Sequence, residues 1–251
     1  LALYVDRVYD VPGNHDGATL LLATFAFAWQ IYFDFSGYTD MARGVARAMG
    51  FDLMLNFNNP YLATGIGDFW RRWHISLSTW FRDYVYVPLG GNRNGPVRTY
   101  VNVFITMVVS GLWHGAGWNF VIWGALHALG SLITRELERS PFYKKRVPDF
   151  VKRTWVFLFV LFAWIFFRAH STGDAWVIIT RIATAGVGDP RFPLVLLAIV
   201  GAIWLYEFFY ESRWKTLVQL RPVRVGLVVA MVFYLALCST AGEQAFIYFQ
   251  F

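Results

Sequence analysis

The chain has 251 residues, of which 57% are apolar and only 15% are charged. Soluble domains carry about 25% charged residues, so this balance excludes an ordinary soluble domain and predicts an integral membrane protein. The net charge of +6 then marks cytoplasmic loops rather than a nucleic-acid-binding surface. The single cysteine, Cys238, excludes a disulfide framework and a cysteine-rich metal site.

Six apolar segments predict an all-α, polytopic transmembrane protein. The first, residues 19–35, runs into a polar stretch in which Ser36 or Asp40 is expected to cap the helix. Three glycines separate the next two, so these form either two short helices or one broken helix. Neither an internal repeat nor a low-complexity linker is present, and we expect one membrane domain over residues 1–251. The remaining segments are residues 100–110, 117–133, 155–167, 192–206 and 223–239.

The loops between the later segments alternate in charge. Residues 135–153 and 211–224 are rich in arginine and lysine, whereas the charges of residues 169–191 balance. Because cytoplasmic loops of membrane proteins carry an excess of arginine and lysine, we expect the two basic loops to face the cytoplasm. The C-terminal tail then lies outside.

The motif at residues 111–120, GLWHGAGWNF, places the ionisable side chain of His114 between two apolar runs. An imidazole at membrane depth costs free energy unless it faces a cavity or a partner, which favours a functional role. Its ordinary pKa near ~6.5 suits proton abstraction at neutral pH. The structural alternative is that Gly111 and Gly115 form a small-xxx-small pattern for close helix packing.

A second candidate site is the aromatic and basic segment 68–83. As one helix, it would place Trp70, Trp73 and Trp80 on one side and Arg71, His74 and Ser78 on a neighbouring polar stripe. This pattern predicts an interfacial or re-entrant helix. Two interpretations remain open: the arginines anchor the helix to lipid phosphates, or His74 enters the same cavity as His114.

Three further stretches have structural interpretations. His127 would lie about 220° from His114 around a continuous helix, so a two-histidine metal site is not expected unless the glycines break that helix. His127 is then a packing residue. Residues 56–61 predict a turn in which the asparagines bond backbone groups, and residues 88–96 predict an exposed connector.

Six stretches occur in the order typical of one family, and through them the chain resembles the membrane-bound O-acyltransferase family. The likeness is greatest to its bacterial branch, which includes the alginate O-acetylation and teichoic acid D-alanylation proteins. Members of the family have about as much chain again before the position of Leu1, so we expect this chain to be the C-terminal part of the fold. The matching stretches are residues 32–40, 56–58, 68–78, 88–93, 111–120 and 246–251.

The resemblance implies acyl transfer, most closely O-acetylation, with His114 and His74 as the catalytic pair. No bound cofactor or metal is expected, and the acyl donor is a thioester substrate, either acetyl-CoA or an acyl carrier. The expected location is the bacterial inner membrane, with the lipid bilayer, a periplasmic SGNH-type acetyltransferase and a polysaccharide acceptor as partners. D-alanyl transfer, donor transport without chemistry and a non-catalytic scaffold remain alternatives. Side chains expected to bind donor or substrate are Arg71, Arg72, Trp73, Ser78, Trp113 and Asn119.

Overall fold

The computed structural model describes residues 1–238, which are helical apart from turns and connecting loops. They divide into two compact units, Leu1–Phe192 and a second that begins at Pro193. Within the described range, α2 (Gly17–Ala48), α8 (Asp149–Arg168) and α10 (Leu194–Glu211) are long and apolar enough to cross a membrane by length and composition. The prediction of an all-α, polytopic membrane protein is confirmed. The resemblance at residues 246–251 lies outside the described residues.

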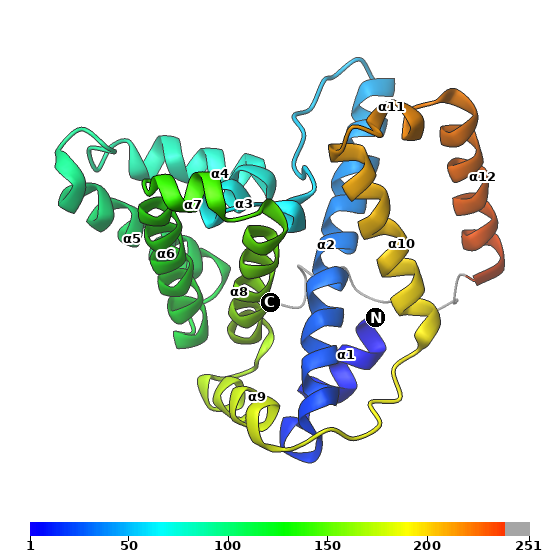
Figure 1. Ribbon diagram of the computed structural model, residues 1–251, viewed down its shortest axis with the longest axis horizontal. Helices are drawn as coiled ribbons and strands as arrows, with labels where there is room; N and C mark the ends of the chain where they lie inside the picture. Colours follow the sequence, from blue (N-terminus) through cyan, green and yellow to red (C-terminus); the bar gives the residue numbers. More distant parts are fainter. Residues whose placement is uncertain (239–251) are drawn as a thin grey trace. The chain divides into compact units, whose positions relative to one another are not determined.

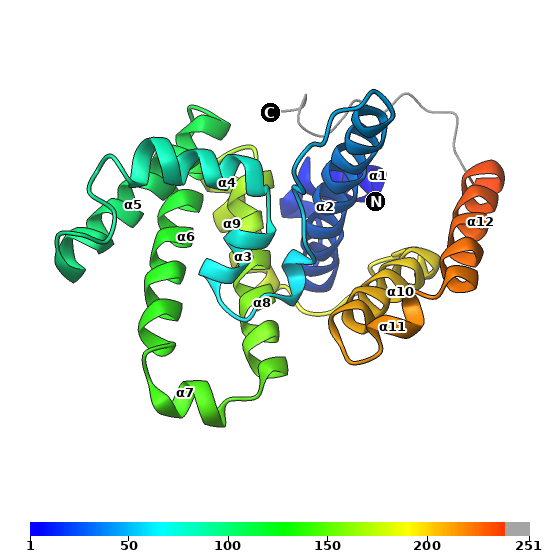
Figure 2. The same ribbon diagram turned by 90° about the horizontal axis from the view of Figure 1, so that it is seen from above.

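The first unit contains most of the sequence motifs, and its helices α1 to α9 are shown in Figures 1 and 2. Its helices α5 and α6 pack side by side, α6 packs on α8, and α2 packs against α1, α8 and α9. The short helix α7 connects the end of α6 to the start of α8 (Figure 2). Besides α2 and α8, the elements are α1 (Ala2–Tyr9), η1 (Pro12–Asn14), η2 (Pro60–Leu62), α3 (Ile66–Arg72), α4 (Ile75–Phe81), η3 (Arg82–Tyr86), α5 (Gly95–His114), α6 (Trp118–Leu137), α7 (Pro141–Arg146) and α9 (Thr172–Thr184).

Helix α2 begins at a side-chain cap and continues well past the predicted end. The carboxylate of Asp16 accepts hydrogen bonds from the backbone N–H of Thr19 at 3.0 Å and from its hydroxyl at 2.7 Å. These bonds lower the pKa of Asp16 to about 2. The expected cap at Ser36 or Asp40 is wrong, because both lie inside the helix, where Asp40 pairs with Arg43 at 3.2 Å.

The apolar runs around His114 form two helices, α5 and α6, that break apart at Gly115–Gly117. The two helices approach very closely. A Cβ atom on Gly111 would overlap the carbonyl oxygen of Phe120, and one on Gly124 would overlap that of Met107. Glycine at these positions therefore lets the two backbones touch, so Gly111 does serve close packing.

The second unit contains α10, the short helix α11 (Lys215–Val218) and α12 (Arg221–Cys238). Helices α10 and α12 occupy the two apolar segments predicted over residues 192–206 and 223–239. Most of their large apolar side chains are exposed, as is typical of helices that face lipid.

Candidate active site

The aromatic and basic segment is two short helices, not one. Trp73 has an extended backbone, and His74 adopts the left-handed conformation, with φ 42° and ψ 56°, between α3 and α4. The predicted alignment of Trp73 with Trp80 is wrong, because a left-handed residue ends the helical period. Trp73 is 2% exposed, whereas Trp80 is 49% exposed.

Residues 56–58 form a strap that holds the break between α3 and α4 through hydrogen bonds. The buried side-chain oxygen of Asn56 accepts hydrogen bonds from the backbone N–H of Ser76 at 3.1 Å and from its hydroxyl at 2.9 Å. The Asn56 carbonyl accepts from the N–H of Ile75 at 3.0 Å, and the N–H of Asn58 donates to Arg72 at 2.9 Å. The prediction that an asparagine here bonds backbone is confirmed for Asn56, and its target is the start of α4.

The imidazole of His74 lies at this break, half-buried. Its ring meets Phe35 of α2 edge to face, with centroids 4.6 Å apart. The neighbouring Trp73 packs among core rings, including Trp164 of α8 at 5.2 Å. The break therefore directs one side chain, Trp73, into the core and leaves His74 partly accessible.

His114 is the last residue of α5 and is also half-buried. Three rings surround its imidazole: Trp113 at 4.9 Å, Phe167 at 5.0 Å and Trp123 at 5.2 Å. His74 lies within electrostatic range of His114. Two histidines that are distant in the sequence therefore lie near each other, beside an aromatic wall formed by the rings of Trp113, Trp123 and Phe167.

The side chains expected to bind donor or substrate have different surroundings. Arg71 and Arg72 both pair with Asp68, at 3.4 Å and 3.1 Å, and the Arg71 side chain stays 72% exposed. The side-chain amide of Asn119 donates to the carbonyl oxygens of Phe166 and Ala169 at the end of α8. Asn119 and Trp73 thus hold the fold together, whereas Arg71 points a cation outward.

Trp113 is exposed, whereas Ser78 forms a hydrogen bond to the backbone. Trp113 is 54% exposed, and its ring contacts His114. Ser78 donates its hydroxyl to the carbonyl of Trp73 at 3.2 Å and lines a pocket. Both side chains therefore lie close to one of the two histidines or to the backbone that holds it.

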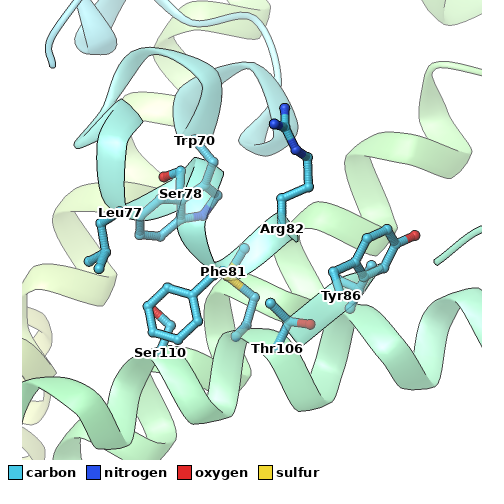
Figure 3. A pocket seen from close by; sticks show the side chains of 10 residues that line it. Trp70, Leu77, Ser78, Phe81, Arg82, Tyr86, Thr106 and Ser110 are labelled. Carbon is cyan, nitrogen blue, oxygen red and sulfur yellow. The ribbon is translucent and has the colours of Figure 1, made fainter. Parts of the chain in front are cut away.

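The pocket has a volume of about 180 Å³ and lies between the segment α3–α4–η3 and helix α5 (Figure 3). Its walls are largely apolar. Trp70 forms part of the wall, and the same indole ring contacts Trp123, the neighbour of His114, at 5.7 Å. The pocket is therefore separated from the surroundings of His114 by aromatic side chains. The rest of its lining is formed by Leu77, Phe81, Arg82, Tyr86, Val103, Thr106, Met107 and Ser110.

His127 lies closer to His114 than a continuous helix would allow. The glycine break turns α6 back along α5, and His114 and His127 both contact the ring of Trp123, at 5.2 Å and 4.8 Å. His127 is fully buried, in agreement with a packing role. The sequence pattern did not predict Trp123 and Phe167 as neighbours of His114. Trp123 precedes His127 by one helical turn, a spacing that could have identified their contact.

Comparisons with known proteins identify relatives of this chain. Residues 9–172 match the membrane-bound O-acyltransferase family, MBOAT. The chain is 50% identical over 176 residues to the probable alginate O-acetylase AlgI of Pseudomonas aeruginosa, which covers 70% of this chain and 33% of that protein. It is 40% identical to the peptidoglycan O-acetyltransferase of Helicobacter pylori, across 100% of this chain and 53% of that protein.

A third relative is the teichoic acid D-alanyltransferase of Bacillus subtilis, 37% identical over 43% of this chain and 29% of that protein. The chain thus spans between about a third and about a half of the length of these curated relatives. The family match covers the two-histidine site and the helices that build it. The chain is a multi-pass membrane protein and belongs to the membrane-bound O-acyltransferase family.

Proposed function

We propose that the protein transfers an acetyl group from a cytoplasmic thioester to a hydroxyl on the outer side of the membrane. The observation that supports this most is the meeting of His74 and His114, both half-buried, beside an aromatic wall. A neutral imidazole in such a place can accept a proton from a hydroxyl and return it. Apolar rings around it exclude water, which would otherwise hydrolyse the thioester.

In the proposed reaction, His114 takes the proton of the acceptor hydroxyl as that oxygen attacks the thioester carbonyl carbon. His74 donates a hydrogen bond to the oxyanion that forms, a contribution worth about 10²–10³-fold in rate for a preorganised donor. The carbon–sulfur bond then breaks, and His114 returns the proton to the leaving thiolate. The products are the ester and the free thiol, with no net change in protons.

The surroundings suit a thioester donor such as acetyl-CoA or an acylated carrier. The exposed cation of Arg71 can attract a phosphate group, with Arg72 beside it, although Asp68 offsets part of their charge. The apolar pocket behind Trp70 is separated from His114 by aromatic side chains, so the reacting thioester is placed beside the two histidines and not in this pocket. We propose that Arg71 binds the phosphate end of the donor.

The acceptor is proposed to be a polysaccharide hydroxyl, reached directly or through a periplasmic SGNH-type partner, with the protein in the inner membrane. The names of the two O-acetylating relatives support acetyl as the group that is moved. D-alanyl transfer is less favoured, because the relative of that name matches a smaller share of the chain at lower identity.

The test uses the full-length protein in its native membrane and follows radiolabelled acetyl from the thioester to polysaccharide or partner protein. His114→Ala should lower transfer by about 10²–10⁴-fold, the range for a lost general base, while the protein still inserts and folds. His170→Ala, which removes an exposed histidine beside Asp10, should leave transfer unchanged.

Two outcomes would contradict the proposal. Full transfer by His114→Ala would assign the protein to scaffolding, because its partner would then perform the chemistry. Movement of labelled donor across the membrane without any acetylated product would assign it to transport.

A further inference from the structure

His127 has surroundings that are unusual for a polar side chain. It is 0% exposed on α6 and lies inside a box of four rings. Phe69 stacks on it at 6.0 Å, and the other three rings, Trp70, Trp123 and Phe159, meet it edge to face at 4.9, 4.8 and 5.8 Å. Within residues 1–238, no atom forms a hydrogen bond to either of its ring nitrogens.

Phenylalanine or leucine at this position would cost less free energy of folding than histidine, because neither has a polar atom to bury. Burying a polar group without a hydrogen bond is unfavourable, so an imidazole here needs a reason. The edge-to-face rings make angles of 63°, 72° and 87° with the imidazole plane. In this arrangement a ring N–H can point at an aromatic face, a weak but directional contact that phenylalanine cannot make.

One of the box rings links His127 to the proposed active site. Trp123 contacts His127 on one side and His114 on the other, at an interplanar angle of 86° to His114. The indole N–H of Trp123 also has no hydrogen-bond partner among the described residues. No hydrogen bond among the described residues therefore orients the Trp123 ring, and the His127 ring, at 4.8 Å, is among the nearest of the rings packed against it.

We propose that His127 is a positioning residue, which orients Trp123 through directional ring contacts and thereby holds His114 in place for acyl transfer. The proposal rests on the proposed function, in which His114 acts as the base. His127 itself does not touch substrate, since it has no exposed surface. Its effect on the reaction passes through Trp123.

The first experiment does not depend on activity. Diethyl pyrocarbonate modifies accessible neutral imidazoles, and peptide mass spectrometry gives a rate for each histidine in the full-length protein. In His127→Phe, which keeps a ring but removes the N–H, the modification rate of His114 should change at least about threefold. The rate at His170, which is exposed and distant in the chain, should stay the same.

The second experiment is a double-mutant cycle on acetyl transfer. His127→Phe and Trp123→Phe should each lower kcat about tenfold with little change in KM, and the double variant should lose no more than the worse single one. The matched control is Tyr9→Phe, which removes a buried hydroxyl bonded to Thr24 at 2.8 Å but lies outside these ring contacts. It should lower the Tm and leave the kcat of the folded protein unchanged.

The outcomes separate the two proposals. An unchanged His114 modification rate in His127→Phe, or losses that multiply in the double variant, would overturn the positioning role. A changed modification rate together with no acetyl transfer by the unaltered protein would leave the positioning role standing and contradict the proposed function.

Discussion

The two proposed catalytic histidines lie at two chain interruptions that are built in opposite ways. His74 occupies a break that contains no glycine, so its left-handed backbone costs about 1–2 kcal/mol and is held by the strap at Asn56. His114 ends α5 where glycines remove side-chain bulk and let α5 and α6 touch. Hydrogen bonds fix the first interruption, and close van der Waals contact fixes the second.

This difference indicates how each interruption should fail. A hydrogen-bonded break can lose one bond and shift slightly, because the remaining bonds of the strap still act. A contact between two backbones has no such tolerance, since any added atom must push the helices apart. We therefore expect larger effects from changes at the α5–α6 contact than from changes at the α3–α4 break.

The largest effect is expected for Gly124→Leu. Its side chain would overlap the Met107 carbonyl oxygen, and separation of α5 from α6 should cost about 3 kcal/mol or more. Loss of folded protein, followed as the Tm in detergent, and loss of acetyl transfer should appear together.

Gly201→Leu provides the control for this change, because the space around Gly201 of α10 is open over 4 Å. It should leave both the Tm and transfer unchanged. A Gly124→Leu protein with the unaltered Tm would show that the backbones do not touch in the folded protein.

A smaller effect is expected for Asn56→Ala. It leaves the N–H of Ser76 without its acceptor, at a cost of about 1–3 kcal/mol, and lets His74 move. The kcat for transfer should fall several-fold in a protein that still folds, whereas Asn58→Ala, which removes an exposed side chain, should keep full kcat. Equal kcat values for these two variants would show that the strap does not position His74.

The sequence was informative wherever one local pattern decided the structure. The apolar segments predicted the helices around His114 and the later ones, because length and composition suffice for such helices. The break at the glycines between Gly111 and Trp118 was one of two predicted possibilities. The family resemblance also supplied His74 and His114 as a pair before any geometry was available.

Elsewhere the sequence misled, because distant contacts decided the outcome. Nothing local marks His74 as left-handed, since the bonds that hold it come from Asn56. The continuation of α2 beyond Ser36 overrode a plausible cap. His127 and Trp123 gained their place beside His114 only when α6 folded back on α5, which no helical angle along a single helix can describe.

Cross-linking tests whether His74 and His114 share one site. In a full-length protein whose native cysteines, including Cys238, are replaced by serine, His74→Cys and His114→Cys are combined and treated in native membranes with a short bifunctional thiol reagent. Proteolysis and mass spectrometry should find the two peptides joined, whereas the pair His74→Cys with His170→Cys should stay separate. Absence of the 74–114 cross-link, with both thiols shown to be reactive, would show that the two histidines do not share a site.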